Sequence, residues 1–213
     1  MPVRSPKDLA QSLKQGPIEP VYFLFGPEAY LRDEAARAIA EEALRGTLLR
    51  EFNESSFNLL SDDAGSAIAI AEQLPMMSGR RVVRIGNFSK LREADEEVLL
   101  KYLDRPVETS VVIFVADDID KRKRLARLLM AGAAFEFQPL KVNELQSWLK
   151  SHLKKLKVEI DPQAQQRVLE IVASDLHTLT NELNKLAAAA LPSARITVEL
   201  VEQLISRSRE HMN

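Results

Sequence analysis

The chain has 213 residues, 46% of them hydrophobic, and a formal net charge of −2, which allows one large domain or two smaller ones. No stretch approaches the roughly 20 apolar residues of a membrane span, the absence of cysteine excludes disulfides and thiolate metal sites, and the N-terminal residues lack the regions of a signal peptide. We therefore expect a cytoplasmic protein without a membrane partner, in which any contact with nucleic acid depends on local patches.

The first part of the chain alternates between strand-like and helical segments. The apolar run Val21–Phe25 stops at Gly26 and passes into a helical segment, which is the opening unit of an open α/β sheet. Further strands are expected over 48–53, 82–85, 109–116 and 134–137, and helices over 6–15, 64–73, 91–103 and 120–131. Ser5 with Pro6, and Asp62 or Asp63, supply the start signals of two of these helices. Five short strands separated by helices predict a mostly parallel sheet.

The pattern changes after Pro139. Helices are expected over 143–156, 162–172, 175–190 and 197–205, and no strand signal remains. We therefore predict an α/β domain over residues 1–139 and a small helical bundle over residues 140–213.

The turn after the first strand occupies the place of a phosphate-binding loop, whose pattern is G-x-x-x-x-G-K followed by Ser or Thr. Aligned on Gly26, this pattern meets Leu31, Arg32 and Asp33, so only the positive charge is kept. Pro27 has no backbone N–H to offer, and Asp33 adds a carboxylate near any phosphate. The strand over 82–85 also lacks the terminal acidic residues that organise Mg²⁺. The pattern predicts a degenerate loop, although an active P-loop ATPase of the AAA+ class remains an alternative.

Two groups of charged residues allow more than one interpretation. Asp117, Asp118 and Asp120 follow a buried strand and either cap the next helix or hold Mg²⁺. Basic clusters follow at Lys121, Arg122, Lys123, Arg124 and Arg127, and at Lys150, Lys154, Lys155 and Lys157. Such clusters either solvate a helix face or contact DNA phosphates without reading bases. A non-specific DNA-binding module is therefore a further alternative.

The segment over 74–81 is irregular, because Pro75 and Gly79 interrupt it. It carries the adjacent residues Met76 and Met77. The two methionines either fill the core or form an exposed apolar wedge, and the surrounding chain breaks favour the wedge.

Four stretches together resemble the delta subunit family of bacterial DNA polymerase III clamp loaders. They are YFLFGPEAYLRDEA at 22–35, LPMMSGRRVVRI at 74–85, VVIFVADDIDKRKRLARLL at 111–129 and NELNKL at 181–186. The resemblance implies an AAA+-like α/β domain with a degenerate P-loop, followed by a lid-like helical domain. Family members continue into a third, collar domain, so the resemblance covers the first two domains.

The resemblance also implies a function and partners. The expected role is to bind the beta sliding clamp and open, or hold open, its ring interface. Partners would be the gamma/tau and delta prime subunits in a hetero-pentamer, with primed DNA passing through the assembled loader. No catalytic residue, cofactor or metal is expected. The implied clamp-binding residues are Leu74, Pro75, Met76, Met77 and Arg80, and possible DNA-phosphate contacts are Lys121, Arg122, Lys123 and Arg124.

Overall fold

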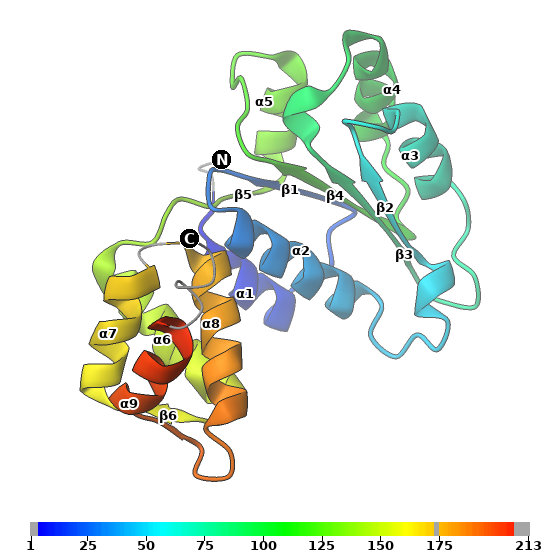
Figure 1. Ribbon diagram of the computed structural model, residues 1–213. Coiled ribbons are helices and arrows are strands. Elements are labelled where there is room, and N and C mark those ends of the chain that lie inside the picture. Colours follow the sequence, from blue (N-terminus) through cyan, green and yellow to red (C-terminus); the bar gives the residue numbers. More distant parts are fainter. Residues whose placement is uncertain (1–3, 173–174, 207–213) are drawn as a thin grey trace. The chain divides into compact units, whose positions relative to one another are not determined.

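The computed structural model describes residues 4–172 and 175–206, and its elements are labelled in Figure 1. The chain divides into two compact units, Met1–Pro139 and Leu140–Asn213. Each unit is described by itself below.

The first unit is built on a five-stranded sheet in the order β2-β3-β4-β1-β5, and every neighbouring pair is parallel. The strands are β1 (Val21–Phe25), β2 (Glu54–Asn58), β3 (Arg81–Gly86), β4 (Ser110–Ala116) and β5 (Ala133–Glu136). A mixed α/β fold with a parallel sheet is therefore confirmed. Because all strands run the same way, their amino ends share one edge of the sheet and their carboxyl ends share the other.

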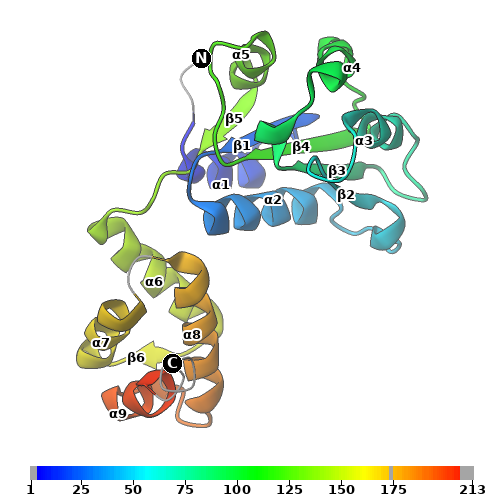
Figure 2. The ribbon, with the colours of Figure 1, turned by 45° about the horizontal axis from the view of Figure 1, so that its top comes forward.

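Helices cover both faces of this sheet, as Figure 2 shows. One face carries α1 (Pro6–Gln15) and α2 (Ala29–Ala43), and the other carries α3 (Ala64–Ala71), α4 (Glu93–Asp104) and α5 (Arg124–Ala131). Short 3₁₀ turns, η1 (Arg50–Phe52) and η2 (Phe88–Lys90), complete the unit. Ser5 caps α1 and Asp63 caps α3, as the sequence indicates.

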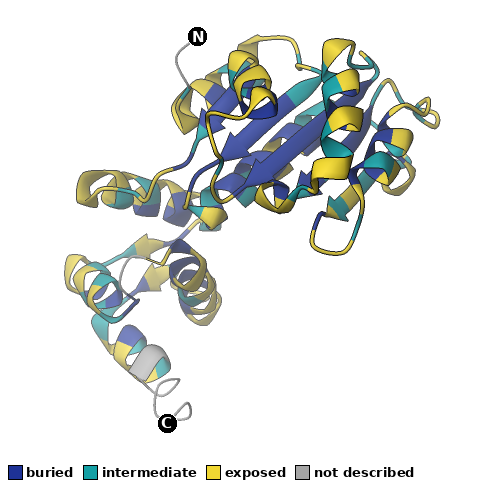
Figure 3. Ribbon diagram, turned by 90° about the horizontal axis from the view of Figure 1, so that it is seen from above, coloured by how far each residue is buried: buried dark blue, intermediate teal, exposed yellow. Residues whose placement is uncertain are grey.

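Two apolar clusters lie on the two faces of the sheet. Phe23 and Phe114 belong to the cluster under α3, α4 and α5, whereas Leu24 and Ile113 belong to the cluster under α1 and α2. Since successive strand residues point to opposite faces, a strand covered on both sides is apolar at nearly every position. This explains why all seven residues of Ser110–Ala116 are buried and why the inner strands β1, β3 and β4 are mostly dark blue in Figure 3.

Two of the predicted elements are wrong in part. The strand expected over 48–53 is a loop followed by η1, and β2 begins only at Glu54. The helix expected from Asp120 begins only at Arg124, because the side chain of Asp120 bonds the backbone N–H of Arg122 and holds the preceding residues in a turn. Asp117, Asp118 and Asp120 therefore shape this connection, and the N-cap of α5 is Lys123.

The second unit is helical. Its elements are α6 (Val142–Leu156), α7 (Pro162–Val172), α8 (Leu176–Ala189), α9 (Val198–Val201) and the π-helical turn η3 (Glu202–Ser206). Its core includes Leu149, Val168 and Leu183. The prediction that no strand follows Pro139 is wrong, because β6 (Glu159–Ile160) pairs with β7 (Arg195–Ile196). A two-residue ladder is too short to produce a period in the sequence. Residues 173, 174 and 207–213 of the predicted domain lie outside the described residues.

None of the helices in the described ranges is long and apolar enough to cross a membrane.

Candidate functional site

The candidate sites lie at opposite edges of the sheet. The segment that carries Met76 and Met77 leads into the amino end of β3, together with the segment that leads into β2. The degenerate phosphate loop follows the carboxyl end of β1, and the basic cluster follows the carboxyl end of β4. The apolar candidate site and the two charged candidate sites therefore lie at opposite ends of the strands.

The segment Leu74–Arg80, called here the apolar loop, exposes large hydrophobic side chains. The exposed fractions are 80% for Leu74, 50% for Met76 and 86% for Met77. Pro75 is half-buried, while Ala71 before the loop and Arg81 after it are buried. The methionines therefore do not fill the core, and the interpretation as core residues is wrong.

The apolar loop is held by one buried side chain from another segment. Asn53 is fully buried, and its Oδ1 accepts a hydrogen bond of 2.7 Å from the backbone N–H of Met76. Its Nδ2 donates to the carbonyl of Met76 at 2.8 Å and to the carbonyl of Leu49 at 2.9 Å. Asn53 thus clamps the backbone of Met76 from both sides and leaves its side chain outside.

Further hydrogen bonds brace the ends of the loop. The hydroxyls of Ser78 and Thr47 lie 2.9 Å apart, and the Ser78 hydroxyl also donates to the carbonyl of Arg80. Arg80 Nη1 donates to the carbonyl of Ile18 at 3.1 Å, and Arg81 Nη2 donates to the carbonyl of Leu74 at 3.2 Å. One amino group of the Arg80 guanidinium, a residue that the resemblance implies in clamp binding, therefore braces the loop itself.

The backbone at Met77 is in the left-handed region, with φ of +48°. A non-glycine residue there costs about 1 kcal/mol or more, and such a conformation persists only when its surroundings hold it. The hydrogen bonds of Asn53 and Ser78 on either side of Met77 provide that hold. The apolar loop therefore presents its most exposed side chain in one defined backbone conformation.

At the other edge, the turn after β1 uses its amide groups within the protein. The N–H of Gly26 bonds the carbonyl of Ala116 at 3.2 Å, and the N–H of Glu28 bonds the carbonyl of Phe137 at 3.1 Å. Gly26 has φ of +119°, and a Cβ added to it would lie 2.4 Å from the carbonyl oxygen of Phe137. Glycine is required here for chain packing. Phosphate-binding loops instead direct such N–H groups toward the ligand.

The positive charge at the position of the phosphate-binding lysine, Arg32, lies close to carboxylates of the same chain. Burial lowers the pKa of the Arg32 guanidinium, while the charges of Asp117, Asp33 and Glu28 act in the opposite direction and favour its protonated form. Asp33 also forms an ion pair with Arg84. Arg32 therefore lies among carboxylates of its own chain.

The basic cluster at the start of α5 is partly neutralised as well. Lys121 pairs with Glu136 at 3.4 Å, and Arg122 forms two hydrogen bonds with the Asp120 carboxylate at 2.9 and 3.0 Å. These bonds hold the pKa of Asp120 low, at about 2. Within the described residues, no group of three or more His, Asp or Glu side chains could hold a metal ion.

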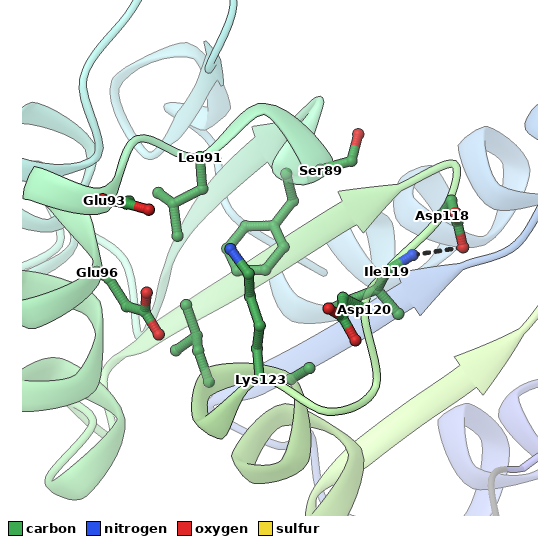
Figure 4. A pocket seen from close by; sticks show the side chains of 11 residues that line it. Ser89, Leu91, Glu93, Glu96, Asp118, Ile119, Asp120 and Lys123 are labelled. Atoms are coloured by element: carbon green, nitrogen blue, oxygen red, sulfur yellow. Dashed lines mark hydrogen bonds between the residues drawn. The ribbon is translucent and has the colours of Figure 1, made fainter.

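A cavity of about 200 Å³ lies between α4 and α5 at this edge. Figure 4 shows Lys123, the N-cap of α5, pointing into it, with Glu93, Glu96 and Asp120 on its rim. This volume is below the roughly 300 Å³ of the smaller ligand pockets. The chain's own lysine also occupies part of it, so the apolar loop remains the stronger candidate site.

Comparison with known proteins identifies the family. The family described as "DNA polymerase III, delta subunit" matches residues 22–138, more than half of the chain. The chain belongs to this delta subunit family. A second family, described as a middle domain, matches residues 141–203. The resemblance inferred from the four sequence stretches is thereby confirmed.

The matches to individual members of the delta family extend over both units of this chain. The chain is 30% identical to DNA polymerase III subunit delta of Bacillus subtilis over 95% of its own length and 61% of that protein. The solved Bacillus subtilis DNA clamp loader delta protein superposes with a TM-score of 0.68 at 28% identity, covering 94% of this chain and 62% of that one. The chain thus spans about three fifths of the length of these delta proteins.

More distant structures share the fold. The Thermotoga maritima RuvB branch migration motor matches with a TM-score of 0.59 and 18% identity, over 94% of this chain and 67% of that one. Domain III of Thermotoga maritima DnaA matches with a TM-score of 0.60 and 12% identity, over 95% and 90% of the two chains. These matches confirm an AAA+-like fold.

Some residues of the site escaped sequence reasoning. The chain breaks at Pro75 and Gly79 indicated the apolar loop, but nothing indicated Asn53 or Thr47. Asn53 precedes its partner Met76 by 23 residues, and a single polar residue before a strand has no pattern of its own.

Proposed function

We propose that this chain is the part of a clamp-loader delta subunit that binds the sliding clamp and opens, or holds open, its ring interface. The observation that carries the proposal is the apolar loop, in which Met76 and Met77 are exposed while the backbone between them is fixed. The family supports a clamp-loader role, since the chain belongs to the delta subunits and resembles a DNA clamp loader delta protein.

The proposed anchor is suited to an apolar pocket on the clamp. Methionine has an unbranched, polarisable side chain that adapts to irregular apolar surfaces. Because Asn53 and Ser78 fix the backbone in advance, binding would require little further ordering of the chain. Removing both methionine side chains should then cost roughly 2–4 kcal/mol of binding free energy, or about 30- to 1,000-fold in affinity.

We further propose that the chain has no ATPase activity of its own. The amides of Gly26 and Glu28 are bonded within the protein, Pro27 has none, and Arg32 lies among carboxylates. This arrangement leaves a phosphate few donors and an unfavourable field. The active P-loop ATPase is therefore the less favoured alternative, and no cofactor is expected.

The remaining partners stay predictions. Assembly with gamma/tau and delta prime subunits and a cytoplasmic location are expected from the resemblance to the delta family. Contact of Lys121, Arg122, Lys123 and Arg124 with primed DNA has weaker support, since Lys121 and Arg122 are paired with carboxylates.

The proposal is tested by the affinity of the chain for the sliding clamp of its own source. Three variants are measured against the wild type: Met76→Ala/Met77→Ala, Met77→Gly and Leu60→Ala. Met77→Gly removes an exposed side chain at a left-handed position that glycine adopts without strain, so this variant should unfold at the same temperature or higher. Leu60 is 63% exposed and follows the carboxyl end of β2, so its variant serves as the control.

We expect the double variant and Met77→Gly to lose clamp affinity while Leu60→Ala keeps it. Tight clamp binding by Met77→Gly and by the double variant would refute the anchor. A wild-type chain that does not bind the clamp at all would refute the proposed function.

A further inference from the structure

A second apolar segment lies beside the apolar loop, outside the residues that the family resemblance implied. Leu48 is 94% exposed and Phe52 is 53% exposed. Both belong to the connection from α2 to β2, which ends with η1. Leu48 makes no contribution to the core, although its side chain is as apolar as those of buried leucines.

Printed hydrogen bonds join this connection to the apolar loop at both of its ends. Thr47, directly before Leu48, has its hydroxyl 2.9 Å from that of Ser78. Asn53, directly after Phe52, bonds the backbone of Met76 at 2.7 and 2.8 Å. Asn53 also bonds the carbonyl of Leu49 at 2.9 Å. Leu48 and Phe52 are thus bracketed by residues that touch the apolar loop, and both segments lie at the amino edge of the sheet in Figure 1.

We propose that Leu48 and Phe52 form a second arm of the clamp-binding surface, which contacts an apolar patch on the clamp next to the pocket that takes Met76 and Met77. This inference rests on the proposed function. We assign the clamp as the partner of this arm because a protein bound at Met76 and Met77 would lie against the neighbouring segment, which is hydrogen-bonded to Met76 and Ser78.

The chemistry of the arm agrees with this role. Single exposed apolar residues are normal on protein surfaces, whereas large exposed apolar patches mark interaction sites, and here five large exposed apolar residues lie on two segments joined by hydrogen bonds. These five are Leu48, Phe52, Leu74, Met76 and Met77. A large part of the exposed hydrophobic side chains of the first unit is therefore concentrated at one edge of the sheet.

The test measures clamp affinity for Leu48→Ser/Phe52→Ser beside Met76→Ala/Met77→Ala and the control Leu60→Ser. Loss of two large apolar contacts should weaken clamp binding by about 10- to 100-fold, with the control within twofold of wild type. Leu48→Ser alone, at a position with almost no contact to the core, should keep the wild-type unfolding temperature and still weaken binding.

A second readout does not depend on affinity. Because the chain has no cysteine, Leu48→Cys carries a single environment-sensitive fluorophore at the second arm, and Leu60→Cys carries one at the control position. Adding clamp should shift the emission of the probe at position 48 to shorter wavelength and leave the probe at position 60 unchanged.

The outcomes separate the two proposals. If the variant of Met76 and Met77 loses binding while the variant of Leu48 and Phe52 binds like wild type without a shift of the probe, the second arm is refuted and the proposed function stands. If the wild-type chain does not bind the clamp, both are refuted. A loss of binding that is matched by a lower unfolding temperature of Leu48→Ser also counts against the second arm.

Discussion

Substitution of Asn53 by alanine should destabilise the first unit and weaken clamp binding together. Asn53 is fully buried, and its side chain satisfies the N–H and carbonyl of Met76 and the carbonyl of Leu49. In Asn53→Ala the N–H and carbonyl of Met76 lose this partner, while the carbonyl of Leu49 keeps its bond from the N–H of Phe52 at 3.3 Å. The left-handed backbone at Met77 also loses one of the interactions that hold it.

The expected magnitude follows from those three bonds. A net contribution of about 1 kcal/mol for each hydrogen bond, and more where the abandoned group stays away from water, gives a loss of about 2–4 kcal/mol. For a unit of this size the unfolding temperature should fall by about 10 °C. Clamp affinity should fall by about tenfold, since a released loop must be ordered again on binding.

Urea unfolding followed by circular dichroism measures the first effect, and clamp binding at a temperature where the variant is folded measures the second. Asn58→Ala is the matched control, because Asn58 is exposed and its side chain accepts bonds at the end of β2 that water can replace. The reasoning fails if Asn53→Ala shifts the urea midpoint no further than Asn58→Ala does.

The other expected outcomes concern the fold and the degenerate loop. Gly26→Ala should lower the free energy of unfolding by about 1–3 kcal/mol, because its Cβ meets the Phe137 carbonyl. The Cβ of Gly79→Ala enters open space, so this variant should stay within about 0.5 kcal/mol of wild type; equal urea midpoints of the two variants would contradict this. A fluorescent ATP analogue should show no micromolar binding, and saturable binding would refute the silent loop. Burial raises the pKa of Tyr102 from 10.0 to about 12. Its neutral form therefore stabilises the fold below pH 10, and this contribution is lost as the pH rises toward 12. In Tyr102→Phe the free energy of unfolding, measured with urea, should fall less between about pH 10 and about pH 12 than in the wild type, and an identical fall would refute this role of Tyr102. The isolated fragment Leu140–Asn213 should give a helical spectrum and a cooperative melt, and a featureless spectrum would contradict independent folding.

The buried strands could be predicted from the sequence for a simple physical reason. A strand covered by helices on both faces needs apolar residues at nearly every position, so Val21–Phe25 and Ser110–Ala116 were recognisable as almost continuous apolar runs. Helix starts were readable at Ser5 and Asp63, since their side chains accept backbone hydrogen bonds at the cap. These signals depend only on residues within one element.

The edge strand of the sheet could not be predicted in the same way. The edge strand β2 has the sequence ESSFN and is largely open to solvent, so it needs few apolar residues. The preceding segment, with Leu48 and Phe52, has a stronger strand pattern than β2 itself. Pairing with β3 selects Glu54–Asn58 instead, and the choice depends on a partner strand that lies more than 20 residues away.

The wrongly predicted strand and the proposed second arm depend on the same two residues, Leu48 and Phe52. A sequence pattern counts Leu48 and Phe52 as apolar residues that a core must bury, because in most segments folding is the reason for their presence. The first unit folds without burying Leu48, although exposing a leucine forgoes about 1.5–3 kcal/mol of burial free energy. Burial in the core therefore does not explain Leu48 and explains only part of Phe52, which is 53% exposed; contact with the clamp is the role that we propose for both. Because Thr47 and Asn53 fasten them to the loop of Met76 and Met77, the partner that covers one segment should also reach the other.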